Sequence, residues 1–221
     1  MSTGARKNSS APQAIPAVID ELRTIQVPLI SDQLHRIVGT GELKKYDRST
    51  GTMAGTAVTV RVRRGDNLAI LRAYQYCRPG DVMVIDGGGD VSQALLGGIM
   101  STYAKSIGLA GLVVYGAIRD VAEIRMMDFP VFACGNIHRG PYKDGPGEIN
   151  VPVCIGGMSV MPGDIVMGDE DGLLAFAPEE AEDLIAKARA QQAKEEATMQ
   201  AILENRWDLS FVDALEARCN N

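Results

Sequence analysis

The chain has 221 residues, of which 46% are hydrophobic, so it is long enough to form one domain with a substantial core. Its formal net charge is −6 and its basic residues are scattered, which excludes the concentrated positive surface that direct nucleic-acid binding needs. No segment is apolar over the length of a membrane span, and the polar N-terminus has no signal-peptide core. We therefore expect a cytoplasmic protein with no membrane partner.

Three regions are expected along the chain. Residues 1–13 are polar and are predicted to form a disordered N-terminus. Residues 14–178 carry all the strand patterns and are predicted to form a single α/β domain. Residues 179–221 begin with a long helix rich in Ala, Glu, Gln and Lys. Its apolar stripe is thin, which indicates packing on the domain or on a neighbouring subunit.

Hydrophobic spacing and turn residues predict the order of elements within the domain. Alternating residues over 55–63 are typical of a half-buried strand, and four later strands are short and separated by Gly- and Asp-containing turns. The first predicted elements are a helix over 14–25, a second helix after Pro28 with Ser31 or Asp32 as its N-cap, the strand over 55–63 and a helix capped by Asp66 or Asn67. A strand over 82–85, a helix over 92–107 and strands over 109–115 and 130–134 follow. The last elements are four strands over 151–154, 158–161, 165–167 and 173–176 and a helix over 178–203.

The best chemical lead follows the apolar run over 109–115. Arg119 and Asp120 stand where this predicted strand ends, and ligands collect at such places because backbone amides and side chains from several elements converge there. A cation beside a carboxylate indicates a small-molecule site. The alternative is that the pair only caps the next short helix.

Two glycines, Gly97 and Gly98, lie in the predicted helix before that strand, where glycine is otherwise unfavourable. They allow a ligand to approach the backbone closely, so the amides of the following residues could bind a carboxylate. The alternative is close packing of the helix against the sheet. The candidate substrate-binding residues are Gly97, Gly98, Ile99, Met100 and Arg119.

A long polar segment, 135–147, contains His138, Arg139, Tyr142 and Lys143. Loops of this length often carry function or contact a partner subunit.

The chain carries several motifs in a fixed order: Gly55-Thr56-Ala57-Val58-Thr59-Val60, Pro79-Gly80-Asp81-Val82, Gly108-Leu109-Ala110-Gly111-Leu112-Val113-Val114, Gly116-Ala117-Ile118-Arg119-Asp120, Phe129-Pro130-Val131-Phe132 and Pro162-Gly163-Asp164-Ile165-Val166. Together these motifs resemble the RraA-like family, which contains 4-hydroxy-4-methyl-2-oxoglutarate / 4-carboxy-4-hydroxy-2-oxoadipate aldolases and protein regulators of ribonuclease E. The resemblance covers about residues 31–178.

The resemblance implies an α/β/β sandwich of the swivelling type, assembled as a homotrimer or a hexamer with active sites between subunits. It implies that Arg119 binds the carboxylate and oxo group of a pyruvate moiety, and that Asp120 ligates Mg²⁺ or Mn²⁺. Amides around Gly97 to Met100 would hold the substrate. Glu195 or Glu196 of a neighbouring subunit would hold metal-bound water.

One position departs from the pattern of the aldolases that the chain resembles. They carry an acidic residue 21 positions before the Arg, where this chain has Gly98. The regulators lack the Asp that follows the Arg, and this chain keeps it as Asp120. The resemblance therefore favours an enzyme, with a substrate that Gly98 helps to define.

Cleavage next to a 2-oxo acid leaves an enolate, which a divalent cation and an arginine can stabilise together. A Schiff-base lysine would need an apolar pocket, and the lysines of this chain lie in polar patterns. We expect a metal-dependent lyase that releases pyruvate from a 4-hydroxy-2-oxo acid, with related decarboxylation of oxaloacetate. The alternatives are a non-catalytic regulator that binds a ribonuclease, and a lyase for a different acid admitted by the extra room at Gly98.

Overall fold

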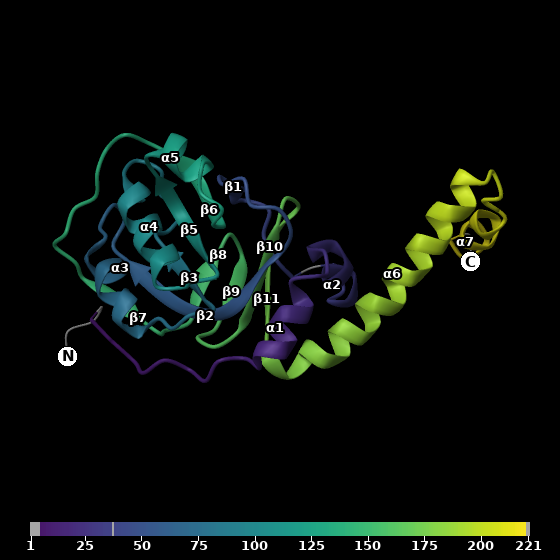
Figure 1. The fold of residues 1–221 in the computed structure, drawn as a ribbon, viewed down its shortest axis with the longest axis horizontal. Helices are drawn as coiled ribbons and strands as arrows, with labels where there is room; N and C mark the ends of the chain where they lie inside the picture. Colours follow the sequence, from purple (N-terminus) through teal and green to yellow (C-terminus); the bar gives the residue numbers. More distant parts are fainter. Residues whose placement is uncertain (1–4, 37, 220–221) are drawn as a thin grey trace.

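The computed structural model describes residues 5–36 and 38–219, and its core is a curved mixed sheet with helices around it (Figure 1). The strands are β1 (Lys44–Lys45), β2 (Met53–Val62), β3 (Asp81–Asp86), β4 (Ala94–Leu96), β5 (Gly111–Ile118), β6 (Val131–Asn136), β7 (Gly147–Ile149), β8 (Val153–Ile155), β9 (Met158–Val160), β10 (Ile165–Asp169) and β11 (Gly172–Phe176). The helices are α1 (Pro16–Leu22), α2 (Val27–Gln33), α3 (Leu68–Ala73), α4 (Gly98–Ser106), α5 (Val121–Arg125), α6 (Ala181–Leu203) and α7 (Phe211–Cys219), with 3₁₀ turns at Tyr74–Tyr76 and Pro178–Glu180. None of the described helices combines the length and apolar character needed to cross a membrane.

The main sheet has nine strands in the order β1-β6-β5-β3-β2-β10-β11, with β4 beside β5 and β7 beside β2. Strands β2, β3, β5 and β6 run parallel at its centre, whereas β10 and β11 are antiparallel additions. Parallel strands put their carboxyl ends at one edge, which is where Arg119 follows β5.

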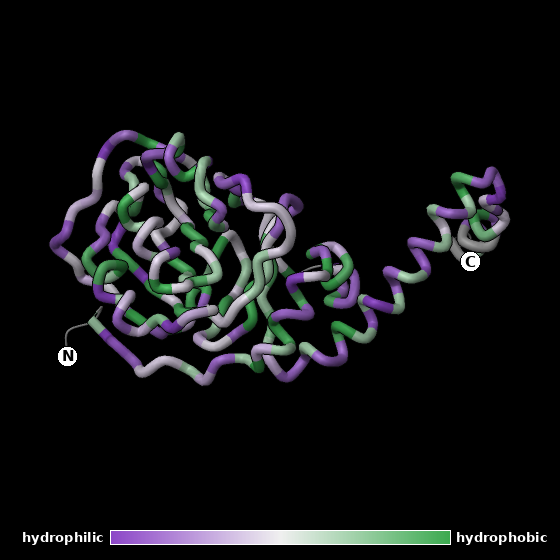
Figure 2. Tube along the Cα trace, viewed as in Figure 1, coloured by the Kyte–Doolittle hydropathy of each residue, from purple (hydrophilic) through white to green (hydrophobic). Residues whose placement is uncertain are grey.

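Side chains of the central strands alternate between two cores, as the period of two requires. Met83 and Ile85 of β3 belong to the core under α3, α4 and α5, whereas Val82 and Val84 belong to the core shared with the β8–β9 pair. Hydrophobic segments gather where these layers meet (Figure 2). The architecture is therefore the α/β/β sandwich that the family resemblance implies.

Strand β2 corrects one expectation. The alternation of polar and apolar residues predicts a half-buried strand, but Thr59 is fully buried and its hydroxyl donates to the Val151 backbone oxygen at 2.6 Å. Only Arg61 within β2 is partly exposed. The strand lies between β3 and β10 with packed layers on both faces, which buries its threonines. Hydrogen bonds satisfy their buried hydroxyl groups.

The segment over 92–107 is also corrected. A single helix is predicted there, but the chain first forms β4, which pairs with β5, and α4 begins only at Gly98. Three apolar residues in a row are compatible with a short buried strand as well as with a buried helix, and sequence periodicity cannot separate the two. Similarly, α2 begins at Val27, earlier than Ser31 or Asp32, with Pro28 in its first turn.

The two ends of the chain lie against the domain to different extents. Residues 5–13, which are expected to be disordered, run along it instead: Arg6 Nε donates to Glu148 Oε1 at 2.7 Å, and Ser10 donates to the Tyr76 backbone oxygen at 2.7 Å. The first turns of α6 bury Leu184 and Ile185 against α1 and α2, after which the helix extends away from the domain (Figure 1).

Candidate functional site

Arg119 and Asp120 occupy the turn between β5 and α5. Asp120 is the N-cap residue of α5 and has a left-handed backbone with φ of 56°, which Asp tolerates better than most residues. Its side chain makes no capping hydrogen bond to that helix. Instead Asp120 Oδ2 accepts a hydrogen bond from the backbone N–H of Gly98 at 3.0 Å. The pair therefore does more than cap the next helix.

Gly97 and Gly98 make room for acidic side chains. A Cβ atom on Gly97 would lie 2.3 Å from Asp120 Oδ2, and one on Gly98 would lie 2.1 Å from Glu123 Oε2. The two glycines therefore let carboxylate side chains approach the backbone closely. The alternative expectation was that they let the helix pack against the sheet. The close approach also corrects the idea of extra room at Gly98, since Glu123 holds that space.

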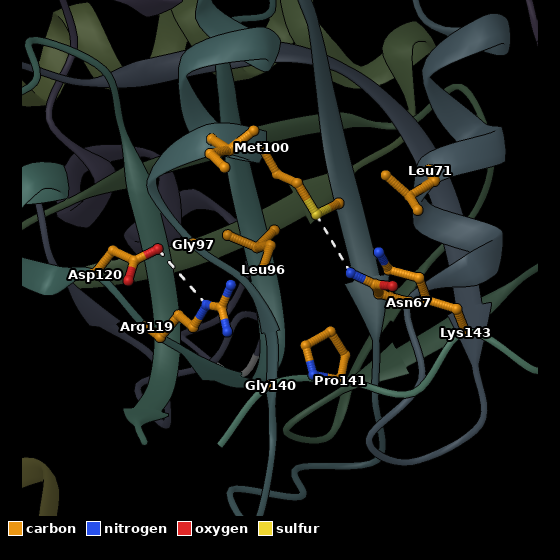
Figure 3. A pocket seen from close by; sticks show the side chains of 11 residues that line it. Asn67, Leu71, Leu96, Gly97, Met100, Arg119, Asp120, Gly140, Pro141 and Lys143 are labelled. Atoms are coloured by element: carbon orange, nitrogen blue, oxygen red, sulfur yellow. Dashed lines mark hydrogen bonds and ion pairs between the residues drawn. The ribbon is translucent and has the colours of Figure 1, made fainter. Parts of the chain in front are cut away.

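A cavity of about 340 Å³ lies beside the pair, within the range of small-molecule sites (Figure 3). Of the predicted residues, Gly97, Ile99, Met100, Arg119 and Asp120 line it, and Gly98 does not. The other lining residues are Asn67, Leu71, Leu96, Gly140, Pro141 and Lys143.

Arg119 is held in the cavity wall with donors to spare. Its backbone N–H donates to the Leu96 oxygen at 3.0 Å, and its Nε lies 3.6 Å from Asp120 Oδ2. The Arg119 side chain is 43% exposed, so the guanidinium can meet a ligand from solvent. Two parallel N–H groups suit a carboxylate.

Asn67 is a lining residue that the sequence indicated only as a helix cap. Its Nδ2 donates to the Leu95 backbone oxygen at 3.0 Å, while its buried Oδ1 has no hydrogen-bond partner among the described residues. An unpaired buried acceptor is unfavourable by about 1–3 kcal/mol. No spacing signal in the sequence places it beside Arg119, because the two residues are 52 positions apart.

Asp66 joins the polar loop to this site. Its Oδ2 accepts the backbone N–H groups of Asp144 at 2.7 Å and Gly145 at 2.9 Å, and its Oδ1 accepts that of Leu68 at 3.0 Å. Burial by itself raises the pKa of Asp66, but these amides and Arg63 outweigh it, so the pKa lies below its ordinary value. The loop between β6 and β7 is thereby fixed against the start of α3.

The donor set for a divalent cation is small. Asp120 Oδ2 makes the two contacts described, whereas Oδ1 has no hydrogen bond to any residue that the structure describes. The Glu123 carboxylate lies beside Gly98. In the part of the chain that the structure describes, no group of three or more His, Cys, Asp or Glu residues is placed to hold a metal. Mg²⁺ commonly binds through one or two carboxylates and keeps several waters, so Asp120 with Glu123 nearby fits such an ion.

Glu195 and Glu196 lie far along α6, outside the cavity. Both are exposed, and each accepts a hydrogen bond from the glutamine one turn earlier, at 2.8 Å for Glu195 and 3.0 Å for Glu196. Because α6 points away from the domain, a single chain does not bring them to Asp120 (Figure 1). Their expected role in a neighbouring subunit stays a prediction.

Comparison with known proteins assigns the chain to a family. A family model described as RraA-like, Aldolase/RraA, matches residues 27–175. The chain belongs to the RraA-like family. This RraA-like chain is 40% identical over 187 residues to a Halalkalibacterium halodurans protein provisionally named 4-hydroxy-4-methyl-2-oxoglutarate aldolase. The aligned region covers 85% of this chain and 89% of that protein.

Two matches from Thermus thermophilus, a curated sequence and a solved structure, carry different names. One, named 4-hydroxy-4-methyl-2-oxoglutarate aldolase, is 39% identical over 121 residues, covering 55% of this chain and 73% of its own. The other is a solved structure of an RNA-processing inhibitor, RraA, with 33% identity and a TM-score of 0.63 over 69% of this chain and 92% of its own. The names of these matches therefore include both an aldolase and an inhibitor of RNA processing.

Proposed function

We propose that this chain is a divalent-metal-dependent lyase that cleaves a 4-hydroxy-2-oxo acid, similar to 4-hydroxy-4-methyl-2-oxoglutarate, to release pyruvate. The observation that carries the proposal is the arrangement of Arg119 and Asp120 on one cavity, with Asp120 held by the Gly98 amide. Names of relatives at 40% and 39% identity support the same reaction class.

Each residue has a task that follows from its position. The Arg119 guanidinium would bind the 2-oxo acid and stabilise negative charge as the carbon–carbon bond breaks. Mg²⁺ or Mn²⁺ held by Asp120, when bound, would supply Lewis-acid polarisation of the oxo group. Free amides at the start of α4, around Ile99 and Met100, would orient the carboxylate. The same charge stabilisation suits oxaloacetate, whose decarboxylation also leaves an enolate.

The active assembly is proposed to be a homotrimer or a hexamer. The cavity is open to solvent in one chain, and Ile99 beside it is 84% exposed, so a second subunit would close it. In that assembly Glu195 or Glu196 of a neighbouring copy would approach the site of Asp120.

The direct test measures pyruvate release from 4-hydroxy-4-methyl-2-oxoglutarate and from oxaloacetate, coupled to lactate dehydrogenase, with Mg²⁺ and again with EDTA. We expect turnover that EDTA abolishes and added Mg²⁺ restores. Absence of pyruvate from both acids, with Mg²⁺ present and the protein folded, would contradict the proposal.

A second candidate is a non-catalytic regulator that binds a ribonuclease. It is favoured by the likeness to the Thermus thermophilus RraA structure, an RNA-processing inhibitor at 33% identity. Inhibition of a purified ribonuclease, together with no pyruvate release, would support this candidate over the lyase. Retention of Asp120 beside Arg119 in one cavity favours the lyase.

A further inference from the structure

Two cationic side chains reach the same cavity from different elements. Arg119 follows β5, and Lys143 belongs to the loop between β6 and β7; Figure 3 shows them on opposite sides of the cavity. The sequence indicates only that this loop carries function or contacts a partner subunit. A second cation across from Arg119 changes which ligand the cavity suits.

The backbone on both sides of Lys143 is fixed. Before it, Tyr142 N–H donates to the Gly65 oxygen at 2.8 Å and Asn67 N–H donates to the Tyr142 oxygen at 3.0 Å. After it, the N–H groups of Asp144 and Gly145 donate to the buried Asp66 carboxylate. A side chain carried on a backbone held at both ends is preorganised, which lowers the entropic penalty of binding.

The Lys143 ammonium is available for a ligand. It has no hydrogen bond or ion pair with any residue in the described part of the chain. The neighbouring carboxylate, Asp144, pairs with Arg63 and not with Lys143: Asp144 Oδ2 lies 3.5 Å from Arg63 Nη2. The rest of the cavity wall is mostly apolar and includes Leu71, Leu96, Ile99, Met100 and Pro141. Such a wall suits the carbon chain of a molecule that is charged at both ends.

We propose that Lys143 binds the far carboxylate of a dicarboxylic 2-oxo acid whose first carboxylate is bound by Arg119. The assignment makes Lys143 a specificity-determining residue: it distinguishes a dicarboxylic acid from a monocarboxylic acid of the same length. It rests on the proposed function only in placing the 2-oxo acid end at Arg119. The competing explanation is a solvated surface lysine with no ligand.

Binding of two unreactive five-carbon probes tests the assignment without requiring cleavage. 2-Oxoglutarate has a carboxylate where 2-oxopentanoate has a methyl group, so the ratio of their dissociation constants isolates the far carboxylate. Titration calorimetry with Mg²⁺ would be run on the unaltered protein, on Lys143→Met and on Arg139→Met. Arg139→Met is the matched control, because it removes the same charge from the same loop at a residue that does not line the cavity.

We expect the unaltered protein and Arg139→Met to prefer 2-oxoglutarate, and Lys143→Met to lose about 10-fold of that preference while binding 2-oxopentanoate unchanged. Equal affinity of the unaltered protein for both probes would overturn the assignment. An equal loss for both probes in Lys143→Met would also overturn it. Failure of the lyase proposal is seen separately, as lack of pyruvate release by a protein that still binds the probes.

Discussion

The Gly98 backbone N–H donates to Asp120 Oδ2 over 3.0 Å, which joins the first residue of α4 to the turn that follows β5. This contact holds the Asp120 carboxylate beside Arg119 at the cavity wall. It also explains why a glycine pair begins α4, because a side chain on Gly97 would collide with that carboxylate.

Asp120→Asn separates the charge of this residue from its hydrogen bond. Asparagine keeps an oxygen that can accept the Gly98 N–H, so the unfolding temperature should stay close to that of the unaltered protein. Loss of the charge should lower pyruvate release at least about 100-fold even with excess Mg²⁺. Calorimetric Mn²⁺ binding should weaken in parallel. Asp128→Asn, an exposed carboxylate outside the cavity, is the control; undiminished turnover in Asp120→Asn would contradict the metal role.

Arg119→Lys tests the fork-shaped contact to the 2-oxo acid. Lysine keeps the positive charge but has a single ammonium in place of two parallel N–H donors. Inhibition by oxalate, which resembles the enolate, should weaken about 10-fold. Arg125→Lys on the exposed part of α5 should leave it unchanged. Equal oxalate inhibition in Arg119→Lys would place the acid elsewhere.

Gly97→Ala should damage the site by sterics. The Gly97 backbone is extended, with φ of −156°, so alanine adopts it without strain, but the new Cβ would lie 2.3 Å from Asp120 Oδ2 and 2.8 Å from Arg119 Cγ. Both side chains must shift, and we expect at least about a 10-fold loss of kcat/KM. Gly41→Ala has no heavy atom within 4 Å of its new Cβ and serves as the control. Full activity in Gly97→Ala would show that Asp120 need not stay where it is.

Asp66 makes stability depend on pH in acid. Burial raises the pKa of Asp66, but backbone amides and Arg63 lower it further, so the folded pKa lies below the unfolded one. The charged carboxylate therefore stabilises the fold above about pH 4, and this contribution is lost as the pH falls through the folded pKa. Asp66→Asn should lower the free energy of unfolding by about 2 kcal/mol at pH 7, and the difference should shrink below about pH 4. Urea unfolding across pH 3 to 7 measures it, and a difference independent of pH would refute the charge effect.

Glu195 and Glu196 test whether sites form between subunits. Each is changed to Gln alone, and we expect one of the two variants to lose about 10-fold in pyruvate release while the other serves as its control. Mixing the weaker variant with Asp120→Asn should recover part of the activity, because some interfaces then pair an intact Asp120 with an intact glutamate. A monomer by light scattering, or no recovery on mixing, would count against shared sites.

Much of the architecture was predictable from local pattern. Apolar runs such as 109–115 identify the central strands because strands buried on both faces need continuous apolar residues. The position of Arg119 and Asp120 after β5 follows from the same run. Strand β4 and the full burial of Thr59 were not predictable, since both depend on which strands lie beside them.

The sequence by itself determined the family, through its motifs, and the place of Arg119 and Asp120 after an apolar run, because short runs of neighbouring residues carry these signals. The α/β/β layers followed from the family resemblance. Only the tertiary structure decided that Asp120 faces Gly98, that Glu123 fills the space over that glycine, and that Asn67 and Lys143 reach the same cavity. Those contacts join residues between 22 and 76 positions apart in the chain. They depend on the packing of β4 against β5 and on the Asp66 carboxylate that holds the loop, which no periodicity records.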